Sequence, residues 1–488
     1  MNKTLLMICM SGGVFNTVAW ANDQPLDIKS RHISNDYLEA KNTLNQRPGN
    51  EPFNSNFPVG PRNANPESSS PVKGKKLFTD QGQWLTDHGI LPRMGLTQLY
   101  FNNPSSGIDT NRSESLTMIS VGADFELEKI IGLQGGYVHF EELFVPWTHN
   151  LSYGNQVGSL IAGKPNPYIP KKTHLTLFTY EQKLLDNKLS IEVGKNNLSN
   201  YMTVPICNTG FTCVNSILIE SAGLNPPPYA NWSARVAYDI NPKLRVQAGW
   251  VKSNNAYPFT NGWERDEGKA REYGGSLSDV YVADVAYKTN FKMEKYPLTL
   301  EAFGFYNNRD QVNPLNAETS NAAKGIYLAG KKVFWRADGD QGSNSNPKAL
   351  AAYSAVTRNF GENVTIGVGT QVNAGLILSH PFESRPFDSY SVSFIWDQLT
   401  KSEQRYLQQS YTGTDGFKPS RSEKAFALDA NFILTDSIVF SPYIMRTFDD
   451  TTWMVPTSSA KPKSGIAFGA VFHIQLDTLL GLNPKSHP

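Results

Sequence analysis

The stretch NWSARVAYDINPKLRVQAGW, residues 231–250, decides the fold class of this chain. Apolar and polar side chains alternate on both sides of Asn241-Pro242, and this period of two predicts two β-strands joined by a tight turn. One face collects the apolar residues Trp232, Ala234, Val236, Tyr238, Leu244, Val246, Ala248 and Trp250. The opposite face carries Arg235, Arg245 and Gln247. In a soluble sandwich the apolar face would line a core, whereas in a membrane barrel it would face lipid and the arginines would face water.

The N-terminus indicates export from the cell interior. The chain begins MNKTLLMICMSGGVFNTVAWA, in which Lys3 precedes an apolar run and Ala19-Trp20-Ala21 forms a small-x-small cleavage site. These features predict a signal peptide over residues 1–21. The alternative is an unprocessed amphipathic helix, but the apolar residues lack helical spacing.

The composition fits either a soluble protein or a membrane barrel. No run of 18 apolar residues follows the signal peptide, so the sequence predicts no transmembrane helix. A mean hydropathy of −0.39 is also expected of a barrel, because alternate residues of each strand face water. The 21 Tyr, 26 Phe and 9 Trp would supply aromatic girdles at the membrane interfaces. A net charge of +1 gives no reason to expect a nucleic-acid partner.

The three cysteines predict one local disulfide. Cys9 is removed with the signal peptide, which leaves Cys207 and Cys213 in VPICNTGFTCVNS. In an exported chain two nearby cysteines in a turn-rich stretch favour a disulfide that fixes a loop. A metal site is the alternative, but it would have only two thiols and no nearby His. We expect neither a metal nor a cofactor.

The mature chain divides into three parts. Residues 22–80 are rich in Asn, Pro and Ser, and we expect a largely disordered periplasmic segment. Residues 81–478 alternate strand-like segments with turns, and 479–488 form a tail. A short helix is expected within KKLFTDQGQWLTDHGI, ending at Gly89. The predicted strands begin at about 92, 115, 133, 173, 187, 231, 243, 278, 297, 325, 349, 363, 389, 424, 438 and 464. Their irregular connections set the number of strands at sixteen to within two.

A closed transmembrane antiparallel up-and-down barrel fits these strands better than a sandwich. Several strands repeat the alternation of apolar and polar residues, as in KAFALDANFIL and LTLEAFGF. A single sandwich of about 400 residues would exceed the usual size of a domain. Closure into a barrel also removes the edge strands that so many β segments would otherwise expose.

Three stretches resemble the carbohydrate-selective porin family of Gram-negative outer membranes, often called the OprB family. They are SAGLNPPPYANWSARVAYDINPKLRVQAGW, LTLFTYEQKLLDNKLSIEVGK and WLTDHGILPRMGLTQLYFNNPSSG. The second is similar to the family's hairpin "YEQ…D.RLS…GK", and the resemblance runs with gaps from about 84 to 476. It implies a sixteen-stranded barrel that admits sugars by passive diffusion through a narrowed, charged eyelet. The chain departs from the family pattern in its long N-terminal segment and in a C-terminus, GLNPKSHP, that lacks an aromatic end.

The sequence places candidate residues on both sides of this wall. The candidate pore-lining residues are Arg235, Arg245, Glu192, Glu301, Asp429 and Gln247. Arginines would donate hydrogen bonds to sugar hydroxyls and carboxylates would accept them, while binding stays weak enough for release. Alternatively, these charges only pair with one another in a wet lumen. The candidate lipid-facing residues are Trp232, Val236, Tyr238, Val246 and Trp250.

Other functions fit the sequence less well. A general diffusion pore or a channel for anions or organic acids is the main alternative, although an anion channel should show a one-sided ladder of cations. No G-x-S-x-G occurs to support a barrel lipase, and no P-loop supports an energised transporter. The expected partners are small neutral carbohydrates, outer-membrane lipid or lipopolysaccharide, and the barrel-assembly machinery. The chain would be a monomer or a homotrimer.

Overall fold

The computed structural model describes residues 76–163, 173–203, 206–209, 221–224, 229–254, 260–263, 277–291, 293–339, 346–364 and 366–482. The predicted signal peptide, most of the predicted N-terminal segment, Cys213 and the last six residues lie outside these ranges. The strands are β1 Ile90–Asn102, β2 Ser113–Glu126, β3 Gly136–Thr148, β4 Thr173–Leu184, β5 Leu189–Asn196, β6 Asn231–Asn241, β7 Leu244–Asn254, β8 Leu277–Lys288, β9 Leu298–Asn307, β10 Gln311–Val312, β11 Thr319–Ser320, β12 Ala323–Arg336, β13 Ala349–Asn359, β14 Val368–Ser379, β15 Ser389–Leu399, β16 Ser422–Thr435, β17 Ile438–Phe448 and β18 Ile466–Gln475. The helices are α4 Thr79–Asp87, α5 Leu127–Ile131, α6 Tyr153–Val157, the 3-10 turn η3 Leu198–Asn200, α9 Lys401–Ser410 and α10 Leu476–Leu480.

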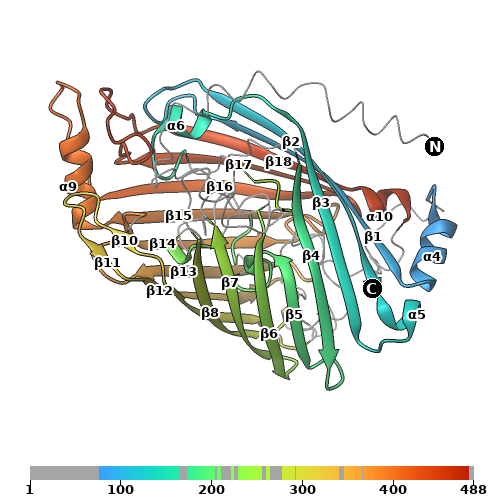
Figure 1. Cartoon of the computed structure of the whole chain (residues 1–488). Coiled ribbons are helices and arrows are strands. Elements are labelled where there is room, and N and C mark those ends of the chain that lie inside the picture. The colour runs from blue at the N-terminus through green and yellow to red at the C-terminus, as the bar shows by residue number, and fades with distance from the viewer. Residues whose placement is uncertain are drawn as a thin grey trace, which may run out of the picture.

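Sixteen of the strands form one closed antiparallel barrel (Figure 1). Each strand pairs with its neighbour in sequence, except that the small hairpin β10–β11 lies outside the ladder between β9 and β12. The barrel closes where β1 pairs with β18, from Gly95 opposite Gln475 to Asn102 opposite Phe468. The predicted fold class is therefore confirmed. The predicted strand starts also agree with the structure, and the largest difference is five residues, at 363 against Val368.

Side chains alternate between the two faces of the wall. In β6, Arg235 is 2% exposed and points inward, while the next residue, Val236, is 46% exposed on the outer face. The same alternation of buried and exposed positions continues through strands on the far side of the barrel, such as β13 and β17. No helix in the described part of the chain is long and apolar enough to cross a membrane.

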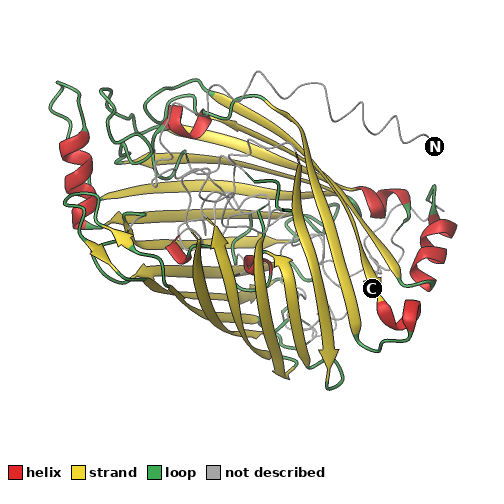
Figure 2. Cartoon of the chain, in the orientation of Figure 1, coloured by secondary structure: helices red, strands yellow, loops and turns green. Residues whose placement is uncertain are grey.

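The two ends of the barrel differ. At one end the connections include the short turns 185–188, 242–243 and 436–437, and at the other they include the long stretches 149–172, 197–230, 400–421 and 449–465. Short turns are typical of the periplasmic end of outer-membrane barrels and long loops of the extracellular end. Helices α4, α5 and α10 lie at the end with the short turns, and α9 lies at the opposite end (Figures 1 and 2).

Helices α4 and α10 fasten the two ends of the barrel sheet together at its periplasmic end. The backbone N–H of Phe78 donates to the carbonyl of Leu480 over 2.8 Å. Lys76 reaches Asp436 of the β16–β17 turn at 2.5 Å. A β-carbon at Gly82 would lie 2.2 Å from the carbonyl oxygen of Gly481, so the close contact between the helices requires glycine. Helix α10, which follows β18, therefore packs on helix α4, which precedes β1.

An extracellular connection folds into the barrel and packs on its inner wall. Helix α6 lies in this connection, and its Tyr153 and Val157 are buried in a cluster with inward residues of β1, such as Phe101. The rings of Phe101 and Tyr153 stack with centroids 6.2 Å apart. Burying one such side chain fully stabilises the fold by about 1.5–3 kcal/mol, so part of the barrel interior is a packed core.

Glu423 of β16 holds this connection against the inner wall. Its carboxylate accepts hydrogen bonds from the backbone N–H groups of Leu160 at 3.0 Å and Ile161 at 2.9 Å. It also accepts from the hydroxyl and the backbone N–H of Thr451 in the neighbouring β17–β18 connection, at 2.5 and 2.6 Å. One buried carboxylate therefore holds two extracellular connections against the wall.

In the middle of the membrane-facing band, the outward face should tolerate apolar side chains only. Val236 lies between the outward Trp232 and Tyr238, and Val236→Arg would place a charge between these two aromatic positions. We expect this substitution to destabilise the folded barrel, reducing its free energy of unfolding from a bilayer by about 2–4 kcal/mol. Urea-dependent folding into vesicles measures this change, with Val236→Leu as the control. Equal stabilities of the two variants would mean that Val236 does not face lipid.

Asp450 should make the β17–β18 connection sensitive to pH. Burial, together with the nearby carboxylate of Glu423, raises the pKa of Asp450 to about 8. Because the folded state then holds a proton that the open state releases, stability is greatest below about pH 4, falls as the pH rises, and the contribution is lost above about 8. We expect hydrogen-exchange protection of residues 449–465, corrected for intrinsic rates, to fall between about pH 5 and 8 by up to about tenfold per pH unit and to level off above that range.

Asp450→Asn is the control for this titration, because an amide cannot release a proton. Its protection should stay constant over the same pH range. A fall in protection that is the same in the variant and in the wild-type chain would exclude Asp450 as the cause.

Candidate functional site

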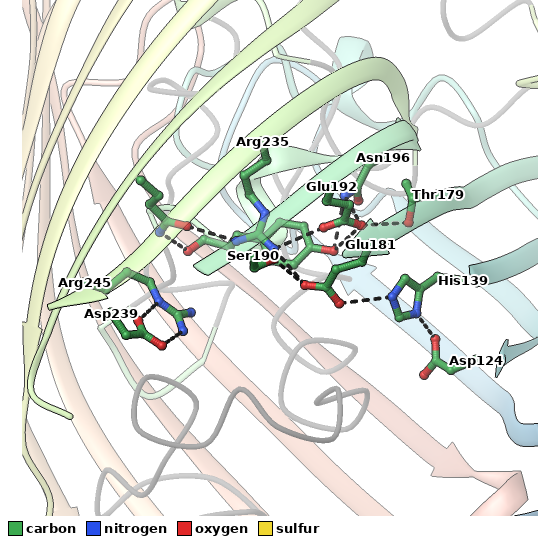
Figure 3. Close-up of polar contacts among 12 residues, drawn as sticks. Asp124, His139, Thr179, Glu181, Ser190, Glu192, Asn196, Arg235, Asp239 and Arg245 are labelled. Carbon is green, nitrogen blue, oxygen red and sulfur yellow. Dashed lines mark hydrogen bonds and ion pairs between the residues drawn. The ribbon is translucent and has the colours of Figure 1, made fainter. Parts of the chain in front are cut away.

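Arg235 lies at the centre of a polar network on the inner wall (Figure 3). Its Nη2 donates to Glu192 at 3.1 Å, to Ser190 at 3.3 Å and to Glu181 at 3.4 Å. Its Nη1 donates to Gln247 at 3.3 Å. These distances exceed the 2.7–2.9 Å that is usual for charge-assisted hydrogen bonds, so each bond is weak. The Nε–H of Arg235 is buried and has no acceptor in the described part of the chain.

Glu192 is surrounded by further donors. Thr179 of β4 donates its hydroxyl to Glu192 at 2.7 Å, and Asn196 donates its amide at 3.0 Å (Figure 3). The hydroxyl of Tyr201 also donates to it at 3.2 Å. The ring of Tyr201 lies under the guanidinium of Arg235, with 4.0 Å between Cζ and the ring centroid. Such a contact attracts the cation to the face of the ring and orients it.

The network continues from Glu181 toward β1. His139 lies between two carboxylates: its Nε2 is 3.2 Å from Glu181, and its Nδ1 forms a short hydrogen bond with Asp124 (Figure 3). Arg93 donates its Nε to Asp124 at 2.7 Å. Hydrogen bonds thus link basic side chains and carboxylates along the inner wall from β1 to β6, and these contacts hold the side chains in place.

The segment 197–203 folds inward over this wall and covers it. It starts where Asn197 caps η3 by accepting a hydrogen bond from the N–H of Ser199 at 3.0 Å. Gln247 of β7 donates its amide to the carbonyl of Tyr201 at 2.9 Å. The backbone N–H of Thr203 donates to Glu301 of β9. Two of the predicted pore-lining residues therefore hold an extracellular connection inside the barrel.

A few residues further on, the same connection contacts the opposite wall. Asn208 donates its amide to Asp429 of β16 at 2.6 Å, and Ser389 of β15 donates to Asn208 at 2.6 Å. The amide of Asn431 donates to the carbonyl of Asn208 at 2.5 Å. Asn208 is five positions after Thr203, and a chain of that length spans at most about 18 Å. The described parts of the connection, 197–203 and 206–209, therefore contact two different walls of the lumen, and we call them the bridge.

Cys207 is disulfide-bonded and lies next to Asn208 in this bridge. Its predicted partner, Cys213, is outside the described residues, so the pairing of these two remains a prediction. A disulfide at this position would restrict the loop where it meets the β15–β16 wall.

Arg245 lies apart from the constriction, near the turn that joins β6 to β7. It forms two hydrogen bonds with Asp239, at 2.5 and 2.7 Å, in a bidentate pair (Figure 3). The structure thus brings Arg235, Glu192, Gln247 and Glu301 together around the segment 197–203. Of the other two predicted pore-lining residues, Asp429 lies on the opposite wall. Arg245 lies near the periplasmic turn between β6 and β7.

The five predicted lipid-facing residues lie on the outer face of β6 and β7. Val236 and Tyr238 are exposed there, and Trp232, Val246 and Trp250 are partly buried. This face also contains a polar contact, in which Trp250 donates its indole N–H to Asp279 of β8 at 3.0 Å.

Sequence reasoning missed several residues of the site. Glu181 shares the inward face of β4 with Thr179 and Lys183, so the period of two that identified Glu192 could also have identified it. Tyr201 and Asn208 belong to a loop, where no periodic pattern indicates which side chains turn inward. The described residues contain no group of three or more side chains that could hold a metal ion.

Comparisons with known proteins agree with this geometry. The family model for the carbohydrate-selective porin, OprB family, matches residues 111–446. A structure of Pseudomonas putida OprB at high pH is 17% identical, covers 83% of this chain and 99% of that chain, and has a TM-score of 0.68. The low-pH structure of the same protein is 13% identical with equal coverage and a TM-score of 0.50. At such identities these structures show a shared fold. A search of curated protein sequences gives no match.

The family match covers more than half of the chain, and the closed barrel is the fold that this family requires. The chain is therefore a membrane channel of the bacterial outer membrane, and it belongs to the carbohydrate-selective porins of the OprB family.

Proposed function

We propose that this porin lets small neutral sugars of the size of glucose diffuse passively through the constriction formed by the bridge 197–209 and the Arg235 network. The observation that carries the proposal is the guanidinium of Arg235, which stacks on Tyr201, donates four weak hydrogen bonds and has no acceptor for its Nε–H among the described residues. A sugar hydroxyl can exchange with such weak partners at little cost, because it accepts and donates in the same way as the group that it replaces.

The mixed signs of the wall favour a neutral solute. Glu181 and Glu192 face Arg235, and Asp124 faces Arg93, so each of these two cations of the wall is paired with at least one carboxylate. A bare ion would lose its hydration shell in the narrow passage and gain no net counter-charge. A sugar loses only hydrogen bonds to water, which the wall can replace. We propose no catalytic step, because diffusion requires only these reversible contacts.

A general pore, or a channel for anions or organic acids, is the second candidate. Any water-filled barrel carries inward charges, and in this structure Arg235 is almost completely covered by its neighbours. If those contacts never exchange with a solute, the network would only hold the bridge in place, and passage would depend on size alone.

Liposome swelling separates these functions. Purified protein in vesicles should admit glucose clearly faster than a neutral amino acid of similar size, and a disaccharide more slowly than glucose. The physical reason is that only the sugar presents a full rim of hydroxyls to the constriction. Rates that follow solute size alone would instead support a general pore.

Arg235→Gln should reduce this preference. Each weak hydrogen bond is worth about 1 kcal/mol, so we expect the preference for glucose over the amino acid to fall about fivefold, measured by swelling. Arg336→Gln is the matched control, because Arg336 also points inward, pairs with Asp338 at 2.6 Å and stacks on Phe291 at 5.0 Å. Circular dichroism and heat-dependent mobility on gels show whether each variant has folded.

The Arg235 network would have no part in selecting the solute if Arg235→Gln kept the preference of the wild-type chain. The same conclusion would follow if Arg235→Gln and Arg336→Gln changed it equally.

A further inference from the structure

An aromatic patch covers the outer face of β15, β16 and β17 near their extracellular ends. Phe394 and Phe426 pack with ring centroids 5.1 Å apart, and Phe426 and Phe448 with centroids 6.3 Å apart. Trp396 lies beside them on β15, opposite Lys424 in register. Below the patch the outward positions are apolar and exposed, including Leu428 at 58%. The patch therefore has the composition of an external girdle above a lipid-facing band.

Two cations lie within this patch. Lys424 is opposite Phe448, and Arg446 is opposite Phe426 on the same pair of strands, so the two cations are diagonal neighbours. Diagonal positions on one face of an antiparallel pair are about 7–8 Å apart, which allows both side chains to reach one group. The guanidinium of Arg446 lies 5.5 Å from the ring centroid of Phe448. Both residues are at the end of the barrel that carries α9 (Figure 1).

The positive charge of this surface is only partly compensated. Lys424 forms an ion pair with Asp449 at 2.9 Å, and among the described residues no carboxylate lies within ion-pair distance of Arg446. Lys424 and Arg446 with Asp449 give a formal charge of +2 − 1 = +1. Arg358, on the outer face of β13, contributes a further charge, and within the described part of the chain it donates to the hydroxyl of Thr370, at 2.5 Å.

These features indicate an anionic ligand that comes from the membrane. A cation beside acyl chains is costly unless an anion neutralises it, and here the cations are directed outward, away from the lumen. The flanking Phe426 and Leu428 offer an apolar surface to chains that extend downward from the anion. A free anion from solution would not use that apolar surface, and a protein partner would be expected to bring carboxylates and to cover apolar residues more evenly.

We propose that Lys424 and Arg446 bind the phosphate group of a phosphorylated glycolipid of the outer leaflet, whose acyl chains lie on the aromatic patch. Arginine suits this role because its planar guanidinium can donate two parallel hydrogen bonds to one phosphate while it stacks on Phe448. Lys424 adds a second charge from the adjacent strand. Arg358, three strands away along the same rim, is positioned for a second phosphate. This site is independent of the sugar pathway, since it lies on the opposite face of the wall.

Native mass spectrometry of the full chain in detergent tests the proposal, with bisphosphorylated lipid A and its dephosphorylated form as probes. We expect the wild-type chain to retain the bisphosphorylated form about tenfold more tightly, because charge-assisted hydrogen bonds to phosphate are the strong ones. The double variant Lys424→Gln with Arg446→Gln should lose that difference. Lys332→Gln with Lys188→Gln is the matched control, since it removes two exposed cations near the periplasmic end and should bind as the wild-type chain does.

Heat-dependent mobility on gels confirms that each variant forms the barrel, and swelling with glucose should be the same in both double variants. The proposal would be wrong if the Lys424–Arg446 variant retained lipid A as tightly as the wild-type chain. It would also be wrong if the dephosphorylated lipid bound equally well, or if inorganic phosphate alone bound as tightly as lipid A. In the last case the surface would be a site for a free anion.

Discussion

The structure depends on the antiparallel pairing of β1 with β18. Without water to hydrogen-bond the backbone, a sheet in the membrane must leave no edge, and only a closed barrel meets this requirement. The pairing joins residues nearly 400 positions apart in the chain, Gly95 with Gln475. The packing of α4 against α10 brings the same two chain regions together at the periplasmic end. Strand β18 is fixed on both sides, by β17 and β1.

Closure creates an interior that two extracellular connections fill in part. The inward face is not uniformly polar: Val251, Val280 and Phe303 face the lumen in a cluster with Leu198 and Met202 of the bridge. An apolar cluster holds the bridge by burial, whereas Glu301 and Asp429 fix its two ends by hydrogen bonds. Burial alone has no preferred direction, so the polar contacts determine where the bridge crosses. The bridge is therefore held from both walls.

Sequence reasoning recovered the barrel because each strand carries its own period of two, and strand starts follow from where that period begins and ends. The same pattern placed Arg235 and Val236 on opposite faces before any coordinates. It could not place Tyr201 or Asn208, because a loop has no period and its path depends on partners distant in sequence. Helix α9 is different: Thr400 caps it by accepting from the N–H of Glu403, and a threonine at this position is a helix-start signal that the sequence itself contains. The sequence could not predict the inward apolar clusters either, since they depend on which loops fold into the barrel.

Arg235 and Arg446 show that arginines on the two faces of the same wall meet different surroundings. Both stack on an aromatic ring, Tyr201 at 4.0 Å and Phe448 at 5.5 Å. Arg235 faces the lumen, where carboxylates from neighbouring strands balance its charge and a neutral solute can exchange hydrogen bonds with it. Arg446 faces outward, where the described chain offers no carboxylate and the surrounding lipid is the remaining source of anions. The difference lies in parity along the strand, because a shift by one residue exchanges the two faces. In the two roles proposed above, parity therefore determines whether an arginine acts on the solute or on the membrane.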